Sequence, residues 1–193
     1  HNNLGVTLQE LGRLDEAETS FTQAISLKPD YAEACYNLGI TLNELGRLNE
    51  AEASYRQAIV LKPDFAQAHS NLGITLQELG RLDEVEASYM EAITLKPDYA
   101  EAHNNLGNTL KELGRLNEAE VSYTKAIVLR PDYVEAHSNL GNTLKELGRL
   151  NEAEASYNQA ISLKPDYAEA HNNLGNTLKE LGRLEEAEAS YRQ

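Results

Sequence analysis

The segment Ala100–Tyr133, AEAHNNLGNTLKELGRLNEAEVSYTKAIVLRPDY, sets the pattern of the whole chain, because close copies of it fill all 193 residues. The five prolines follow one another at intervals of 34 residues, and the 12 glycines form two series with that same interval. A repeat of this length is one supersecondary unit that buries its apolar face only against its neighbours. The period therefore predicts a solenoid.

Each copy has the pattern of two helices. In the first half, Leu106 and Leu110 lie at helical spacing on one apolar face. Gly114 stands where a left-handed residue is expected to end that helix. The second half carries its own apolar face up to Pro131, which cannot continue a helix. The repeat is therefore expected to be a helical hairpin.

Polar residues near the start of each helix are typical of N-caps. Asn117 and Glu120 have the spacing of a capping box before the second helix, and Asp132 and Glu135 repeat it before the next first helix. We therefore expect capping, rather than ligand contact, to be the role of the glutamates at that second position, which are Glu33, Glu101, Glu135 and Glu169.

The pattern Leu106-Gly107, Ala119, Tyr123, Ala126 and Pro131 resembles the tetratricopeptide repeat. His or Cys stands where that family favours Trp, and Leu stands where it favours Tyr. The resemblance covers the whole chain. It implies an all-α, right-handed superhelical solenoid of 34-residue helix-turn-helix repeats whose first helices line a concave groove. It also implies a protein-interaction scaffold.

The register predicts a single array over residues 1–193. It comprises a partial repeat 1–31, full repeats 32–65, 66–99, 100–133 and 134–167, and a partial repeat 168–193. Solenoids normally end in polar capping elements, and neither end has one here. We therefore expect an excerpt of a longer array, whose uncapped ends associate head to tail with other copies.

Charge and composition narrow the possible partners. The chain has 17 Lys and Arg against 31 Asp and Glu, a formal net charge of −14. This balance argues against nucleic acid and anionic membrane surfaces, both of which need a basic footprint. Apolar runs such as residues 58–61 are far shorter than the roughly 18 residues of a membrane span. The expected partner is a protein or peptide.

No residue set predicts catalysis, a metal or a cofactor. Equivalent residues of stacked repeats lie roughly 10 Å apart, whereas zinc ligands must each lie about 2 Å from one ion. The histidines share one repeat position with Cys35, so we expect all of them to be packing residues and the chain not to be an enzyme. Eleven of the twelve aromatic residues occupy two repeat positions and are expected to pack between hairpins. Tyr36 alone departs from these positions and is a candidate partner contact. The histidines are His1, His69, His103, His137 and His171.

An asparagine precedes the Leu-Gly pair in every repeat. These residues are Asn3, Asn37, Asn71, Asn105, Asn139 and Asn173. A carboxamide offers a donor and an acceptor, the complement of a peptide group, so a ladder of them predicts binding of an extended peptide backbone. The alternative is that the asparagines bond to neighbouring helices and specify repeat stacking.

The sequences His-Asn-Asn-Leu and Gly-Asn-Thr-Leu-Lys-Glu resemble the repeat domain of O-linked N-acetylglucosamine transferases. In that family the asparagine ladder holds protein substrates by their backbone. The resemblance implies a second function, a substrate-recruiting module of a larger enzyme such as a glycosyltransferase. A structural or self-assembling array without a groove ligand is the third.

The predicted groove differs between the two halves of the chain. Val6, Ile40 and Ile74 in the first half are replaced by Asn108, Asn142 and Asn176 in the second. Likewise Gln9, Asn43 and Gln77 are replaced by Lys111, Lys145 and Lys179. A glutamate follows each residue of this latter set and is expected to neutralise the lysines in part. The second-half asparagines and lysines, with the six-residue ladder, are the candidate binding residues.

Overall fold

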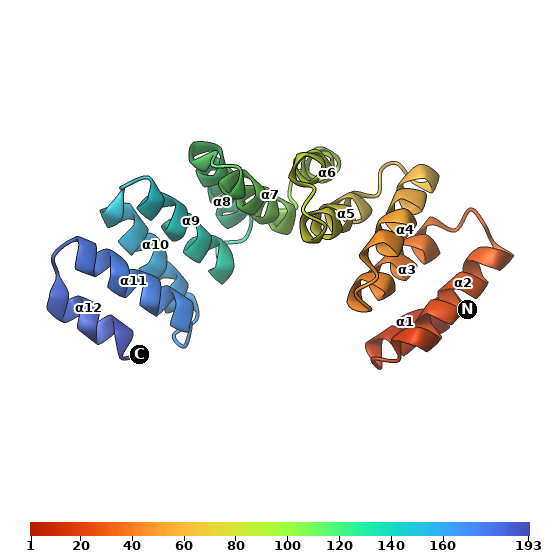
Figure 1. Cartoon of the computed structure of the whole chain (residues 1–193), viewed down its shortest axis with the longest axis horizontal. Helices are drawn as coiled ribbons and strands as arrows, with labels where there is room; N and C mark the ends of the chain where they lie inside the picture. Colours follow the sequence, from red (N-terminus) through yellow and green to blue (C-terminus); the bar gives the residue numbers. More distant parts are fainter. The chain divides into compact units, whose positions relative to one another are not determined.

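The computed structural model describes residues 1–193 and contains twelve α-helices and no strands. Two compact units, residues 1–97 and 98–193, each hold three helical hairpins (Figure 1). The first unit contains α1 (Asn2–Glu10), α2 (Leu14–Leu27), α3 (Ala32–Glu44), α4 (Leu48–Leu61), α5 (Ala66–Glu78) and α6 (Leu82–Leu95). The second contains α7 (Ala100–Glu112), α8 (Leu116–Leu129), α9 (Val134–Glu146), α10 (Leu150–Leu163), α11 (Ala168–Glu180) and α12 (Leu184–Tyr191). The all-α repeat fold is thereby confirmed, and no helix has the length and apolar character of a membrane span.

One glycine series ends the first helix of every hairpin. Gly114 has φ +73°, in the left-handed region. Its N–H donates to the Lys111 carbonyl (2.9 Å) and the Arg115 N–H donates to the Leu110 carbonyl (2.8 Å). These are the two hydrogen bonds of a Schellman motif. The predicted helix end is therefore confirmed.

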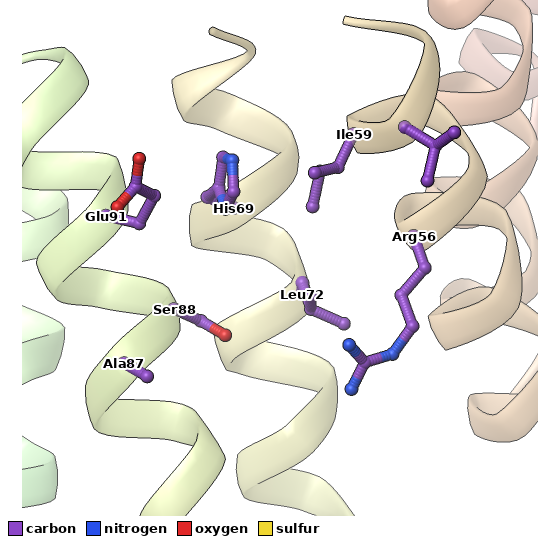
Figure 2. A pocket seen from close by; sticks show the side chains of 8 residues that line it. Arg56, Ile59, His69, Leu72, Ala87, Ser88 and Glu91 are labelled. Atoms are coloured by element: carbon purple, nitrogen blue, oxygen red, sulfur yellow. The ribbon is translucent and has the colours of Figure 1, made fainter. Parts of the chain in front are cut away.

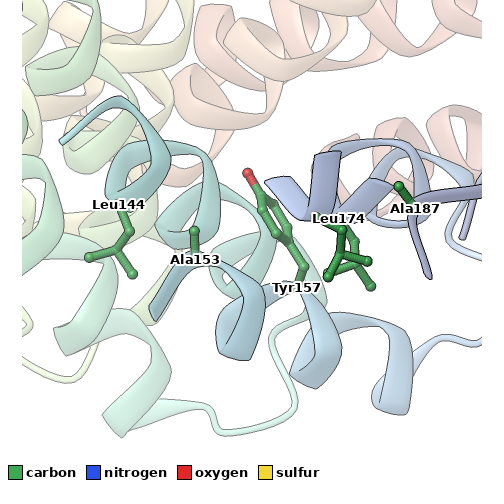
Figure 3. Packing of buried hydrophobic residues seen from close by; sticks show 6 residues of the cluster. Leu144, Ala153, Tyr157, Leu174 and Ala187 are labelled. Carbon is green, nitrogen blue, oxygen red and sulfur yellow. The ribbon is translucent and has the colours of Figure 1, made fainter. Parts of the chain in front are cut away.

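The other glycine series lets the two helices of a hairpin approach closely. The Tyr123 ring is fully buried against Gly107, and a Cβ atom on Gly107 would lie 2.6 Å from Tyr123 Cε1. Tyr157 repeats this packing and joins Leu144, Ala153, Leu174 and Ala187 in a core cluster of the second unit (Figure 3). The aromatic position thus fills the hairpin interior and also reaches the next hairpin.

The predicted capping boxes are wrong. The second helix α8 begins at Leu116, its N-cap is Arg115, and no side chain caps it. Helix α9 begins after Tyr133, again without a side-chain cap. The physical reason is that the left-handed turn at Gly114 leads directly into α8, so Asn117 already lies inside the first turn.

An arginine, and not the predicted asparagine or aspartate, stands at the N-cap position of each second helix. Arg149 binds Glu152 in its own helix (2.7 Å) and Glu120 on the second helix of the preceding hairpin (2.6 Å). The pairs Arg47–Glu18, Arg81–Glu52 and Arg183–Glu154 repeat the link between hairpins. In the sequence, the only sign of this link is a glutamate 29 residues before each of these arginines. Because these pairs are partly exposed, they orient neighbouring hairpins more than they stabilise them.

Candidate functional site

The first helices of the second unit form a polar groove. Helices α7, α9 and α11 contact one another in sequence, and a cavity of about 510 Å³ lies on them. Its lining contains four of the predicted binding residues and three glutamates. These are Lys111, Asn142, Lys145 and Asn173, with Glu146, Glu169 and Glu180. We call this cavity the α7–α9–α11 groove.

A buried tyrosine fixes the asparagines of the groove. The Tyr157 hydroxyl donates to Asn142 Oδ1 (2.7 Å), and Asn173 Nδ2 donates to the same oxygen (3.0 Å). The Asn142 amide group and Asn173 Oδ1 take part in neither bond. The network therefore leaves one donor and one acceptor beside each other at the groove.

The preceding hairpin contains the same network. Tyr123 donates to Asn108 Oδ1 (2.8 Å). Asn139 Nδ2 donates to both Asn108 Oδ1 and Asn104 Oδ1, each at 3.2 Å. Asn108 thus keeps a free amide donor and Asn139 a free Oδ1. The repeat spacing predicts only packing for these tyrosines and does not show the role of their hydroxyls.

Burial extends the pH range over which these phenols stay protonated. Desolvation, and secondarily the carboxylates of Glu112 and Glu146, raises the pKa of Tyr123 far above that of a free phenol. Desolvation likewise raises the pKa of Tyr157, with a smaller contribution from Glu146. A neutral phenol retains its proton for donation. The tyrosines therefore hold the asparagine carboxamides in one orientation at any physiological pH.

The lysines of the groove are paired with carboxylates of the next repeat. Lys111 Nζ lies 2.9 Å from Glu146 Oε1, and Lys145 Nζ lies 3.1 Å from Glu180 Oε1. The expected partial neutralisation is therefore confirmed. Glu169 also lines the groove and accepts a hydrogen bond from Tyr167 (3.1 Å), so its predicted capping role is wrong. With three carboxylates and two ammonium groups, the groove is slightly acidic and is not a cationic clamp.

The first unit retains the asparagines that precede each Leu-Gly pair, but it lacks the free amide donor that Asn108 and Asn142 provide in the second unit. Asn37 Nδ2 donates to Asn2 Oδ1 (3.2 Å), and Asn71 Nδ2 donates to the hydroxyl of Tyr36 (3.1 Å). Apolar Ile40 and Ile74 stand where the second unit has Asn108 and Asn142. This face of the first unit therefore differs chemically from the α7–α9–α11 groove, as the sequence predicted.

The remaining predicted residues lie outside the lining of the groove. Asn3 and Lys179 are exposed, whereas Asn105 and Asn176 are half-buried. Asn105 Oδ1 accepts a 3.4 Å hydrogen bond from Asn104, and Asn176 Oδ1 accepts one from Tyr191 (2.8 Å).

Tyr36, the histidines and Cys35, which the sequence also singled out, make contacts within the fold. The Tyr36 ring packs 4.7 Å from the Phe65 ring, centroid to centroid, so it joins α3 to the start of the next hairpin. Histidine Nε2 atoms lie 2.9–3.1 Å from the carbonyl of the proline six residues earlier, at His69, His137 and His171. Cys35 is buried. No group of three His, Cys, Asp or Glu side chains converges as metal ligands would.

A family profile for the TPR repeat matches residues 5–46, 41–80, 78–114, 107–148 and 141–182. The chain belongs to the tetratricopeptide repeat family. Tetratricopeptide arrays are protein-interaction scaffolds, so this chain is one as well. A search of curated protein sequences gives no match.

Several solved structures share the fold. PilF of Pseudomonas aeruginosa superposes with a TM-score of 0.88 at 19% identity, over 98% of this chain and 86% of that one. YrrB, described as a TPR protein with an unusual peptide-binding site, gives 0.75 at 24%, over 88% of each chain. TTC0263 of Thermus thermophilus, described as a thermophilic TPR protein, gives 0.68 at 28%, over 92% of this chain and 97% of that one.

Proposed function

We propose that the α7–α9–α11 groove binds an extended segment of a partner protein through its backbone. The observation that carries this proposal is the free donor and the free acceptor that neighbouring hairpins of the second unit leave beside each other. The Asn142 amide is free to donate to a peptide carbonyl, while Asn173 Oδ1 is free to accept from a peptide N–H. One peptide group requires one donor and one acceptor.

The repeat spacing suits an extended ligand. Packed helices lie roughly 8–10 Å apart, and an extended chain rises about 3.3 Å per residue. Successive hairpins would thus meet every third residue of the segment. Because side chains between the contacts remain free, recognition of this kind tolerates many sequences. The printed description of YrrB as a peptide-binding TPR protein supports this class of ligand.

The charge of the groove sets a preference among such segments. Both lysines are already paired, and Glu169 has only a tyrosine hydroxyl as partner. A basic side chain in the segment would gain a carboxylate partner, whereas an acidic one would have to displace an existing pair. The groove should therefore prefer neutral or basic segments over acidic ones.

A structural function for the ladder has an observation of its own. The amide donors of Asn37, Asn71, Asn139 and Asn173 all bond to the preceding hairpin. These bonds fix how one hairpin stacks on the next, so the ladder orients repeats even without a ligand. A substrate-recruiting module of a larger enzyme would use the same groove and differ only in what the array is joined to.

Substitution of Asn142 by Ile tests the binding proposal, because Ile already occupies this repeat position at Ile40 and Ile74. The change also removes the acceptor of the Asn173 bond between hairpins, so the Tm is measured together with peptide capture. We expect N142I to retain the helical circular dichroism signal and to lose most peptide capture on an array of extended peptides. The matched control is Asn158→Ala on the exposed face of α10. Undiminished capture by folded N142I would refute the binding proposal and favour the stacking function.

A further inference from the structure

The second helices of the first unit border another cavity. Helices α4 and α6 both pack on α5, and between them lies a space of about 400 Å³ with an apolar floor. Ile59, Val60, Leu72 and Ala87 supply most of that floor, and Arg56 and Glu91 stand at its edges (Figure 2). We call this the α4–α6 groove.

Only one of its two edge charges is already neutralised. Arg56 binds Glu52 (2.8 Å) and Glu84 (2.9 Å). Glu91 lies at the opposite edge, is exposed, and forms no ion pair. The α4–α6 groove therefore combines an apolar floor with one uncompensated negative charge, which fits an aliphatic side chain next to a cation.

A surface of that chemistry exists on α8 of the second unit. Val121 and Val128 are 69% and 66% exposed, and Lys125 lies between them in sequence. Positions i, i+4 and i+7 share one face of a helix. Lys125 has no carboxylate partner. We call these three residues the α8 ridge.

Each of the two surfaces carries residues that differ from those of the other repeats. Glu91 and Lys125 are equivalent residues, and other repeats have neutral Gln23, Gln57 and Gln159 there. Ala53 and Ala155 stand where α8 has Val121. Because alanine and glutamine satisfy the fold at these sites, the two charges and the added valine are not needed for folding.

We propose that the α8 ridge of a second copy of this chain docks in the α4–α6 groove. Lys125 of one copy then pairs with Glu91 of the other, and a flanking valine covers Leu72 and Ile59. The opposite unpaired charges and the matching apolar surfaces carry the choice of occupant. This contact is lateral and is independent of any ligand in the α7–α9–α11 groove.

Sedimentation equilibrium of the whole chain tests the contact. Concentrations from about 10 µM to about 1 mM are suitable because an interface this small binds weakly. In about 0.15 M salt the Debye length is about 8 Å, so repulsion between two copies of charge −14 is largely screened. We expect self-association that V121A/V128S, which restores common repeat residues, weakens about tenfold.

Charge reversal identifies the two surfaces. E91K and K125E should each weaken self-association about fivefold. An equimolar mixture of the two variants should associate more strongly than either alone, because both cross-pairings are then attractive. Circular dichroism checks that all variants fold, and E91Q/K125Q is the neutral control.

Three results would overturn the proposal. A wild-type chain that stays monomeric up to about 1 mM has no such contact. Association that is unchanged in E91K and K125E uses other surfaces, including the chain ends. A mixture no stronger than its components excludes pairing between residues 91 and 125 of different copies.

Discussion

Gly107 and Gly114 lie in the same repeat, and the structure gives them different physical roles. Gly107 faces the buried Tyr123 ring across the hairpin, whereas Gly114 holds the left-handed turn with nothing within 4 Å of an added Cβ. Substituting Gly107 by alanine therefore tests close packing, and substituting Gly114 by alanine tests the left-handed backbone conformation. We expect Gly107→Ala to be clearly more destabilising.

The magnitude follows from the contacts. A Cβ on Gly107 would lie 2.6, 2.8 and 2.9 Å from three ring atoms of Tyr123, where carbon atoms prefer about 3.5–4.0 Å. Overpacking costs about 1–3 kcal/mol, and moving the ring also strains the 2.8 Å hydrogen bond from Tyr123 to Asn108, worth about 1 kcal/mol. Alanine returns about 1 kcal/mol of helix propensity. The net destabilisation should be about 2 kcal/mol.

Gly114→Ala should cost less. Alanine in the left-handed region costs about 1–2 kcal/mol, and the stiffer unfolded chain offsets part of this. A net loss of about 1 kcal/mol corresponds to about 2–4 °C in Tm for a chain of this size, against about 4–8 °C for Gly107→Ala.

Thermal unfolding followed by circular dichroism at 222 nm measures both variants, and hydrogen exchange localises the effect to α7 and α8. In a Tyr123→Leu background the ring is gone, so Gly107→Ala should become neutral or slightly stabilising. Equal Tm losses for the two single variants, or an undiminished loss in the Leu background, would refute the assignment of Gly107 to close packing.

Three further predictions concern charge and burial. Because burial raises the pKa of Tyr55, Tyr123 and Tyr157, their contribution to stability is complete below about pH 10, the unfolded phenol value, and falls as the pH rises above it. Urea unfolding in alkaline buffers, with phenolate absorbance at 295 nm, checks this, and stability that is constant to pH 12 would contradict it. Arg149→Ala should lower Tm at low salt and much less in 1 M NaCl, because its ion pairs with Glu120 and Glu152 are partly exposed; a salt-independent loss would instead indicate lost packing. Burial raises the pKa of the Cys35 thiol, so iodoacetamide should label it at least tenfold more slowly in the native protein than in urea, and equal rates would show that the site is open.

The repeat pattern was sufficient to predict the helical hairpins, the left-handed glycine at the end of each first helix, and the packing role of the aromatic residues. These features depend on spacing within one repeat, where helical periodicity and the special conformations of glycine and proline dominate. The capping assignments failed for a local reason as well. A Schellman turn that passes straight into the next helix leaves no room for a separate N-cap, and spacing alone does not show this.

The candidate site could be predicted only in outline. The sequence identified the asparagines and lysines, and their pairing with glutamates, because each recurs at a fixed repeat position. It did not predict that Tyr157 would orient Asn142, that Glu169 would line the groove, or that arginines would link hairpins to glutamates 29 residues earlier.

The sequence by itself determined that this chain is an array of helical hairpins, since a 34-residue period of glycine, proline and apolar residues permits little else. Only the tertiary structure decided which polar atoms are used within the array and which remain available. That choice depends on distances between side chains of neighbouring hairpins, and a linear sequence does not encode them directly. The donor on Asn142 and the acceptor on Asn173 are free because Tyr157 and the helix packing occupy their other atoms.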